Sequence, residues 1–286
     1  MRKILSVLLL LLAWACKPTP TPVFTPRATP PPAVATAFSI ASPTVAATAI
    51  PLPSLPEGCK TPGKVTSAEL PQPASGSAYS YRLYLPPCYS ADSESRYPVL
   101  YLIPGSKSSP DSWLKAGLPG EMDKLILGKT IPPMIVITTE NTDADPMGET
   151  IYKELIPAIE RQYPIAAGRR YRAVAGGSLG GITAYRLAFR YPDTFSSAGL
   201  FGSGLAPGEE TQVRLWLAQM NDTNRMRVFL NSGTEDAFML DRARAMKSVL
   251  DEMGIENQLY VDASGHHYKY WIPNFDKFLA WISEQW

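Results

Sequence analysis

The chain of 286 residues has little histidine, little cysteine and almost no net charge. It holds two histidines and three cysteines, and its 27 basic and 26 acidic side chains leave a formal net charge of +1. So small a charge gives no electrostatic reason to expect nucleic acid or an anionic membrane surface as a partner. The two histidines, His266 and His267, are adjacent rather than spaced to converge on one ion, so neither a metal site nor a cofactor is predicted.

Several patterns with a known mechanism are also absent. The glycine-rich phosphate-binding patterns G-x-G-x-x-G and G-x-x-x-x-G-K-[ST] do not occur, and no internal repeat is visible. The apolar run at residues 4–12 is too short to cross a bilayer as a helix. The sequence therefore gives no reason to predict a nucleotide-binding protein, a repeat protein or a membrane-spanning protein.

The first residues have the layout of a secretory signal peptide. Met1-Arg-Lys3 is basic, the run at 4–12 is apolar, and Ala13-Trp-Ala-Cys16 brings small residues up to a cysteine. This resembles a bacterial lipoprotein signal over residues 1–15, with Cys16 as the lipidated residue, although Trp14 departs from the usual small residue. We expect an exported bacterial protein that touches the outer face of the cell membrane only through its lipid anchor. The alternative is cleavage near Ala15 and a free secreted protein.

Residues 16–56 form a linker and residues 57–286 a folded domain, which is expected to be a monomer. The linker is rich in proline, threonine and alanine, and it cannot bury enough apolar surface to offset the entropy of ordering. Its prolines favour an extended, semi-rigid spacer of roughly 3 Å per residue. Beyond Cys16, only Cys59 and Cys88 remain, and in an exported chain two remaining cysteines predict a disulfide.

The domain alternates between apolar runs and helical stripes. Runs typical of strands occur at 79–85, 97–103, 134–138, 173–175, 197–201, 227–231 and 258–261. Apolar residues at helical spacing occur at 149–163, 182–189, 240–253 and from 273 onward. Pro157 lies within the first helix and requires a kink or a broken hydrogen bond there. Strands that alternate with helices predict an α/β fold with a mostly parallel central sheet and helices on both faces.

The strand at 173–175 leads into Gly176-Gly-Ser-Leu-Gly180, and a helix follows. Gly-x-Ser-x-Gly between a strand and a helix is the signature of a nucleophile elbow. The turn is so tight that the serine is strained and side chains at the flanking positions would collide with their neighbours. The hydroxyl of Ser178 would be held clear of the sheet, beside the backbone N–H of Leu179. Ser178 is therefore the candidate nucleophile.

A serine nucleophile needs a base and an acid. The histidine pair follows the last predicted strand, and Asp236 follows an earlier one. Loops after parallel strands gather at one edge of the sheet, where ligands bind. Glu235 and Asp241 are rival acids, but Glu235 should point away from Asp236 and Asp241 falls a full turn into a helix. The order of serine, acid and histidine is that of α/β-hydrolases.

The reaction also needs donors for the oxyanion. The backbone N–H groups of Leu179 and of Ser106, in the loop Pro104-Gly-Ser106 after the strand at 97–103, are the candidates. The base would take the proton of Ser178 and return it to the leaving group. Asp236 would fix the tautomer of the base and stabilise its charged form.

These features resemble the esterase D, feruloyl esterase and antigen 85-like family of α/β-hydrolases, from about Tyr79 to Trp286. The matching stretches are Pro98-Val-Leu-Tyr-Leu-Ile-Pro-Gly105 with Trp113, Lys153-Glu-Leu-Ile-Pro-Ala-Ile-Glu160, Tyr171-Arg-Ala-Val-Ala-Gly-Gly-Ser-Leu-Gly-Gly181, Gly233-Thr-Glu-Asp236 and Gly265-His-His-Tyr-Lys-Tyr-Trp271. In that family the catalytic histidine stands five residues before a tryptophan, which selects His266 through Trp271. Two departures are Pro104, where the family has histidine or aspartate, and Tyr268, a changed aromatic.

The resemblance implies a serine carboxylesterase that hydrolyses small acyl or feruloyl-type esters, some of them on carbohydrate. An acyltransferase would use the same residues, with another alcohol in place of water. A catalytically silent surface binding module is the alternative from another class, although such proteins typically lose a member of the triad. Trp113, Tyr152, Phe238 and Trp271 are candidate walls of the substrate site.

Overall fold

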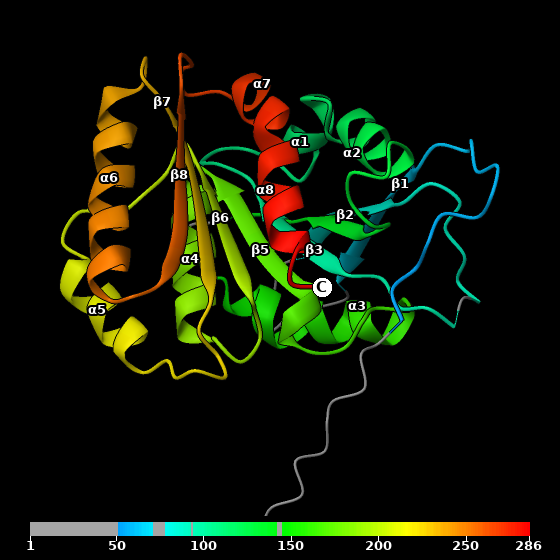
Figure 1. Cartoon of the computed structure of the whole chain (residues 1–286), viewed down its shortest axis with the longest axis horizontal. Helices are drawn as coiled ribbons and strands as arrows, with labels where there is room; N and C mark the ends of the chain where they lie inside the picture. Colours follow the sequence, from blue (N-terminus) through cyan, green and yellow to red (C-terminus); the bar gives the residue numbers. More distant parts are fainter. Residues whose placement is uncertain (1–50, 71–77, 93, 142–144) are drawn as a thin grey trace, which may run out of the picture. The chain divides into compact units, whose positions relative to one another are not determined.

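The computed structural model describes residues 51–70, 78–92, 94–141 and 145–286 (Figure 1). The predicted signal peptide, Cys16 and most of the predicted linker lie outside these residues. The described part contains one eight-stranded sheet, in the order β1-β2-β4-β3-β5-β6-β7-β8. The strands are β1 (Lys64–Leu70), β2 (Tyr79–Leu85), β3 (Val99–Ile103), β4 (Ile135–Thr138), β5 (Arg172–Gly177), β6 (Ser197–Phe201), β7 (Arg227–Gly233) and β8 (Glu256–Asp262).

Most of the sheet is parallel. Strands β1 and β2 pair antiparallel, as do β2 and β4, whereas every pairing among β4, β3, β5, β6, β7 and β8 is parallel. This confirms the predicted α/β-hydrolase fold class. Strand β1 was not predicted, because its sequence Lys-Val-Thr-Ser-Ala-Glu-Leu lies at the solvated edge of the sheet and buries only Leu70. An edge strand of this kind carries little of the apolar pattern by which strands are predicted.

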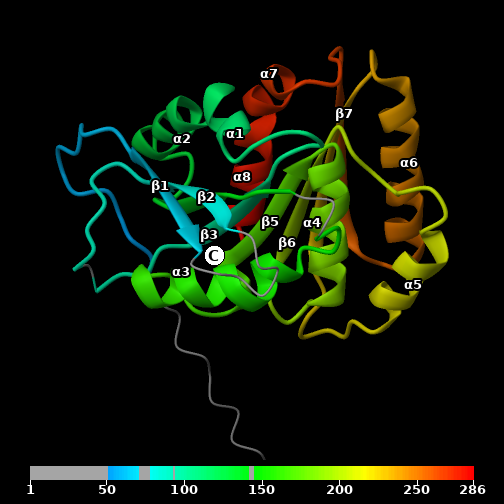
Figure 2. The same cartoon turned by 180° about the vertical axis from the view of Figure 1, so that it is seen from behind.

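Helices cover both faces of the sheet (Figures 1 and 2). They are α1 (Asp111–Lys115), α2 (Leu118–Leu127), α3 (Ile156–Gln162), α4 (Leu179–Arg190), α5 (Glu210–Ala218), α6 (Ala237–Glu252), α7 (Tyr268–Trp271) and α8 (Phe275–Ser283). Short turns of other helix types are η1 (Ile151–Leu155), η2 (Arg169–Tyr171) and η3 (Ile272–Asn274). None of the described helices is long and apolar enough to cross a membrane.

The core has two layers, one on each face of the sheet. Helices α3, α4, α5 and α6 pack with one cluster of buried side chains, and α1, α2 and α8 pack with the other. Successive residues of a strand alternate between them: Tyr101 belongs to the first cluster, and Leu100 and Leu102 belong to the second. A strand buried on both faces needs apolar residues at every position, which explains the continuous apolar runs in the sequence.

Pro157 has the predicted effect on its helix. The N–H of Ile156 donates to the C=O of Ile151, five residues back, so η1 is a π-helical turn. Pro157 follows within the first turn of α3, where its missing N–H costs no hydrogen bond of that helix. The helical stripe at 149–163 is therefore divided into two elements at the proline.

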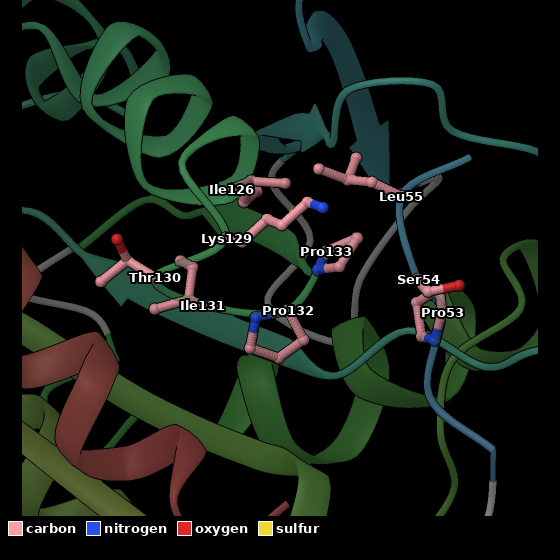
Figure 3. A pocket seen from close by; sticks show the side chains of 9 residues that line it. All are labelled: Pro53, Ser54, Leu55, Ile126, Lys129, Thr130, Ile131, Pro132 and Pro133. Carbon is pink, nitrogen blue, oxygen red and sulfur yellow. The ribbon is translucent and has the colours of Figure 1, made fainter. Parts of the chain in front are cut away.

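The amino-terminal end of the described chain lies against the domain. Cys59 and Cys88 form the predicted disulfide, with their Cα atoms 6.2 Å apart. The segment Pro53–Leu55, from the end of the predicted linker, faces residues 126–133 across a hollow of about 380 Å³ (Figure 3). Leu55 packs against the cluster of α1, α2 and α8, and the C=O of Pro51 accepts a hydrogen bond from the N–H of Arg96. The described chain thus contacts the domain from its first residue, Pro51.

Candidate active site

The three predicted catalytic residues follow three strands at one edge of the sheet. Ser178 comes directly after β5, Asp236 three residues after β7 and His266 four residues after β8. Strands β5 to β8 pair in parallel with one another in turn, so their carboxyl ends lie at the same edge. This edge is where ligands bind in open α/β sheets.

Ser178 has the strained backbone that a nucleophile elbow requires. Its φ and ψ angles are 54° and −123°, outside the region that a residue with a side chain prefers, and it directly precedes α4. A Cβ atom on Gly176 would lie 2.2 Å from the C=O oxygen of Gly180, and one on Gly180 would lie 2.4 Å from the C=O oxygen of Ile103. Only glycine fits at either position. The sequence motif is therefore explained by two close approaches and one strained residue.

Asp236 and His266 are joined by a hydrogen bond of 2.6 Å between Oδ2 of the carboxylate and Nδ1 of the imidazole. The other oxygen of Asp236 accepts the N–H of Met239 and caps the start of α6, so the carboxylate is held from two sides. The aspartate side chain is 14% exposed and the histidine side chain 37%. The geometry leaves Nε2 of His266 for the substrate side, as a general base requires.

Trp271 links the base to the elbow. Its ring meets the ring of His266 edge-on at a centroid distance of 5.3 Å, and it fills the space beside Gly177 and Gly202. Within the described residues no hydrogen bond joins Ser178 Oγ to His266. Such contacts commonly tighten only when substrate is bound. The imidazole of His266 and Gly177, the residue before Ser178, thus lie against one indole ring.

His267 has a different role from its neighbour. Its Nδ1 accepts a hydrogen bond from the N–H of Lys269, at 3.1 Å, and caps the start of α7. The sequence alone could separate the two histidines only through the distance to Trp271. The structure separates them by their partners.

Among the described residues, neither rival acid forms a hydrogen bond with His266. Asp241 pairs with Arg244 on the exposed side of α6, and Glu235 is exposed. In the part of the chain that the structure describes, no group of three or more histidine, cysteine, aspartate or glutamate side chains could hold a metal ion.

The loop after β3 brings the second predicted oxyanion donor to the turn at Ser178. A Cβ atom built on Gly105 would lie 3.5 Å from the Cβ of Ser178 and 3.3 Å from the C=O oxygen of Gly177. Ser106 is the next residue and is exposed. Among the hydrogen bonds of the described residues, none uses the N–H of Ser106 or of Leu179 as donor. Both groups are free for an oxyanion at Ser178.

Two of the four predicted walls of the substrate site, Trp113 and Trp271, are buried, and that prediction is wrong for them. Trp113 is fully buried, and its indole N–H donates to the C=O of Ile103 at 3.2 Å, beneath the loop after β3. Trp271 is 3% exposed and supports the base and the elbow, as described above. Both are aromatic core residues that pack against the loops of the site, and neither exposes a surface that a ligand could contact.

Tyr152 also needs correction. It stacks on Tyr191 with the ring centroids 3.6 Å apart, and Tyr191 stands at the end of α4. Helix α4 has 12 residues and begins beside Ser178, so its far end is about 18 Å away at 1.5 Å per residue. Phe238, in contrast, is 61% exposed and two residues from Asp236. Of the four predicted walls, only Phe238 offers an exposed surface close to the predicted triad.

The sequence reasoning missed two residues that hold the loop after β3. Asn141 donates through Nδ2 to the C=O of Pro104 at 2.9 Å, and the hydroxyl of Tyr268 accepts the N–H of Gly105 at 2.7 Å. A signal for Asn141 was present, because it is a polar residue just after the buried strand β4 at the carboxyl edge of the sheet. For Tyr268 the sequence shows only an aromatic residue two positions after His266.

Comparison with known proteins points to one family. A family model described as "Putative esterase" matches residues 73–282. An endo-1,4-beta-xylanase/feruloyl esterase of Xylanibacter ruminicola is 31% identical over 153 residues, which are 48% of this chain and 21% of that protein, so the chain spans about a fifth of that relative. An uncharacterised Bacillus subtilis protein, YbbA, is 26% identical over 71% of this chain and 91% of its own length.

Solved structures share the fold. A ferulic acid esterase has a TM-score of 0.68 and 23% identity, and the match covers 79% of this chain and all of that one. The feruloyl esterase module of Clostridium thermocellum, complexed with sinapinate, has a TM-score of 0.69 and 18% identity over 83% of this chain and 95% of that one. An S-formylglutathione hydrolase of Staphylococcus aureus has a TM-score of 0.62 and 15% identity, covering 80% and 99%.

Proposed function

Because the chain belongs to this esterase family, we propose that it is an exported serine carboxylesterase that hydrolyses small acyl or feruloyl-type esters through Ser178, His266 and Asp236. The observation that carries the proposal is the 2.6 Å hydrogen bond from His266 Nδ1 to Asp236, at the sheet edge where the strained Ser178 stands. The family and the fold make the chain a carboxylesterase. The residue roles, the substrate class and the export are what the proposal adds.

The first half of the reaction would acylate Ser178. His266 Nε2 takes the hydroxyl proton while Ser178 Oγ attacks the ester carbonyl carbon. The carbonyl oxygen becomes an oxyanion, which the N–H groups of Ser106 and Leu179 stabilise. Asp236 holds the imidazole in the tautomer that carries its proton on Nδ1, and it stabilises the imidazolium that forms. The carbon–oxygen bond to the alcohol then breaks, and the alcohol leaves with the proton from Nε2.

The second half would release the acid. Water attacks the acyl carbon as His266 Nε2 takes its proton, and a second oxyanion forms between the same two N–H groups. The bond to Ser178 Oγ breaks, and the serine recovers its proton from His266. If another alcohol takes the place of water, the same steps give an acyltransferase.

The substrate class is supported by the relatives and by one side chain. Feruloyl esterase appears in the description of the Xylanibacter ruminicola relative, and solved structures of the same fold are ferulic acid esterases. The exposed ring of Phe238 stands two residues from Asp236, where an aromatic acyl group could lie against it. Export is supported by the basic and apolar start of the sequence with Cys16 after it.

The test is labelling of the full-length chain with a fluorophosphonate probe, which reacts with activated serines. Wild type is expected to label, and Ser178→Ala and His266→Ala to stay unlabelled. Ser203→Ala is the matched control, because Ser203 Oγ is buried and has no hydrogen-bond partner among the residues that the structure describes. It should label as wild type does. Hydrolysis of p-nitrophenyl acetate, methyl ferulate and an acetylated sugar then ranks the substrates.

Two results would count against the proposal. A folded wild type that neither labels nor hydrolyses any of the esters would favour a silent binding module. Labelling that survives in Ser178→Ala would mean that another serine is the nucleophile.

A further inference from the structure

We propose that Asn141 and Tyr268 are the positioning residues of the oxyanion hole, and that Tyr268 couples this hole to the loop that carries the base. The inference rests on the proposed function, because it assigns two residues to the same site. It goes beyond that function, since neither residue belongs to the triad or supplies an oxyanion N–H group.

Both residues hold the same peptide unit. Asn141 Nδ2 donates to the C=O of Pro104, and the hydroxyl of Tyr268 accepts the N–H of Gly105. This C=O and this N–H are the two ends of the planar unit between Pro104 and Gly105. A planar group held at both ends cannot rotate about its long axis without breaking one of the two hydrogen bonds. The unit directly before the oxyanion N–H is therefore fixed.

The next peptide unit carries the oxyanion donor. The C=O of Gly105 accepts the N–H of Ser108 at 3.3 Å. In a trans unit the N–H points opposite to the C=O, so this bond turns the N–H of Ser106 the other way. That N–H has no partner among the described residues, and Gly105 lies against Ser178. Fixing Gly105 on both sides thus orients the N–H of Ser106 before any substrate arrives.

Pro104 explains why the anchors are needed. Proline has no N–H, so one of the usual hydrogen bonds is missing where the loop leaves β3. Beyond Gly105 the loop is exposed at Ser106 and Lys107, and Lys107 has a φ of 56°. An oxyanion hole stabilises the transition state only as far as its donors are already aligned, because aligning them during the reaction costs free energy. The side chains of Asn141 and Tyr268 supply hydrogen bonds that fix this part of the loop in place of the one that proline cannot donate.

Each anchor is itself held. Thr183 Oγ1, on α4, lies 3.3 Å from Asn141 Oδ1, which connects Asn141 to the helix that follows Ser178. The ring of Tyr268 packs edge-on against Trp113 and Trp271, with centroid distances of 4.7 and 5.0 Å. These contacts place the hydroxyl whether or not it is hydrogen bonded. Removing only the hydroxyl should therefore leave the ring where it is.

Tyr268 also stands two residues after His266. One side chain thus ties the loop after β8, which carries the base, to the loop after β3, which carries the oxyanion N–H. Gly105 and Tyr268, the two residues that this hydrogen bond joins, are 163 positions apart in the sequence. A shift of either loop is transmitted to the other through this bond.

The experiment uses the full-length chain with Tyr268→Phe and, as matched control, Tyr270→Phe. Tyr270 lies in the same short helix, and its hydroxyl makes no hydrogen bond within the described residues. With p-nitrophenyl acetate, kcat of Tyr268→Phe is expected to fall about tenfold, less than the 10²–10³-fold typical of deleting an oxyanion donor. KM should change by less than about twofold, because the hole acts on the transition state. Tyr270→Phe should match wild type.

Two further readouts separate positioning from general damage. The acid limb of the pH profile of kcat/KM should not move in Tyr268→Phe, because the hydrogen bond that His266 Nδ1 donates to Asp236 is untouched. The double variant Tyr268→Phe/Asn141→Ala should lower kcat by less than the product of the two single fold-decreases, since both side chains hold one peptide unit. The amide of Gly105 should exchange its hydrogen faster in Tyr268→Phe than in Tyr270→Phe, whether or not the protein is active.

The outcomes distinguish this inference from the proposed function. An active wild type with an unchanged Tyr268→Phe would overturn the inference alone, as would a shifted acid limb, which would place the effect of Tyr268 on the base. A wild type without esterase activity would overturn the proposed function. The exchange rate of the Gly105 amide would then decide whether Tyr268 holds the loop, and an unchanged rate would overturn the inference as well.

Discussion

At the scale of single residues, two adjacent histidines have different partners. His266 contacts the carboxylate of Asp236, and His267 accepts the N–H of Lys269 at the start of α7. Helix α7 carries Tyr268 and Trp271, which pack beneath the site. His267 therefore contacts the helix that it caps, whereas His266 is placed for the proposed role of general base.

Replacing His267 should affect stability rather than chemistry. His267→Ala is expected to lower the free energy of unfolding by about 1 kcal/mol, because the N–H of Lys269 loses its cap. Ester hydrolysis should stay within a few fold of wild type, while His266→Ala should lose at least 10²-fold in kcat. His267→Asn is the control, since asparagine also caps helices. Urea unfolding and p-nitrophenyl acetate hydrolysis measure both effects. If His267→Ala lost as much activity as His266→Ala, the assignment of His266 alone as the base would be wrong.

At the scale of elements, α4, the helix that follows the proposed nucleophile Ser178, is linked to the start of α5 by Glu209. The hydroxyl of Tyr185, on α4, donates to Glu209 Oε2 at 2.6 Å and accepts the N–H of Ala206 at 3.2 Å. Arg186 pairs with the same carboxylate. Burial opposes ionisation of Glu209, but the hydrogen bonds from Arg186 and Tyr185 and the charge of Arg186 outweigh it, so its pKa lies below the ordinary value of 4.5.

The lowered pKa of Glu209 predicts how stability depends on pH. The folded state favours the ionised carboxylate, so its contribution is fully present above the ordinary pKa of 4.5 and is lost as the pH falls through the lower pKa of the folded state. The difference in free energy of unfolding between wild type and Glu209→Gln should thus be constant near neutrality and shrink below pH 4.5. Urea unfolding at several pH values measures it.

The neighbouring glutamate provides the control for this prediction. Glu210 pairs with Arg214, but its side chain is mostly exposed, and surface pairs of this kind contribute little. Glu210→Gln should differ from wild type by less than about 0.5 kcal/mol at neutral pH. A difference for Glu209→Gln that stays the same down to pH 3 would show that the pKa of Glu209 is not lowered by folding.

At the scale of the whole domain, the disulfide and the proposed active site lie at opposite edges of the sheet. Tyr84 of β2 pairs with Val136 of β4, so β2 ends where β4 begins, and Cys88 follows three residues after that end. Ser178 and His266 follow the carboxyl ends of their strands. The C=O of Pro51, bonded to the N–H of Arg96 just before β3, also lies at the amino edge. The described chain thus enters the domain away from the site.

Removing the disulfide should therefore change stability but not catalysis. The bond joins cysteines 29 residues apart, and the chain-entropy model gives about 3–4 kcal/mol for a loop of this length. The double variant Cys59→Ala/Cys88→Ala should lose an unfolding free energy of that order, with kcat and KM close to those of wild type while it is folded. Urea unfolding and steady-state kinetics measure the two. A folded double variant with a tenfold lower kcat would show that the two edges are coupled.

Most features that the sequence predicted correctly depend on neighbours along the chain. Apolar runs, continuous in β3 and β4 and alternating in β2, predicted the strands from β2 to β8, and Pro157 predicted the break between η1 and α3. The cysteine count gave the disulfide, and Gly-x-Ser-x-Gly gave the strained turn at Ser178. Helix α2 could also have been predicted, because Leu118, Met122, Leu125 and Ile126 have helical spacing. In each case the cause is local: backbone sterics, a missing N–H or burial on both faces of a strand.

Only the tertiary structure decided which side chains meet. The sequence placed Asp236 and His266 in two loops, but their 2.6 Å contact depends on the pairing of β7 with β8. It proposed Trp113 and Tyr152 as walls, and long-range packing placed one in the core and the other beyond the far end of α4. The hydrogen bond between Gly105 and Tyr268 joins residues 163 positions apart, and no sequence pattern predicts a contact over such a separation. Residue types and local turns follow from the chain itself, whereas contacts between distant loops follow from how the sheet brings them together.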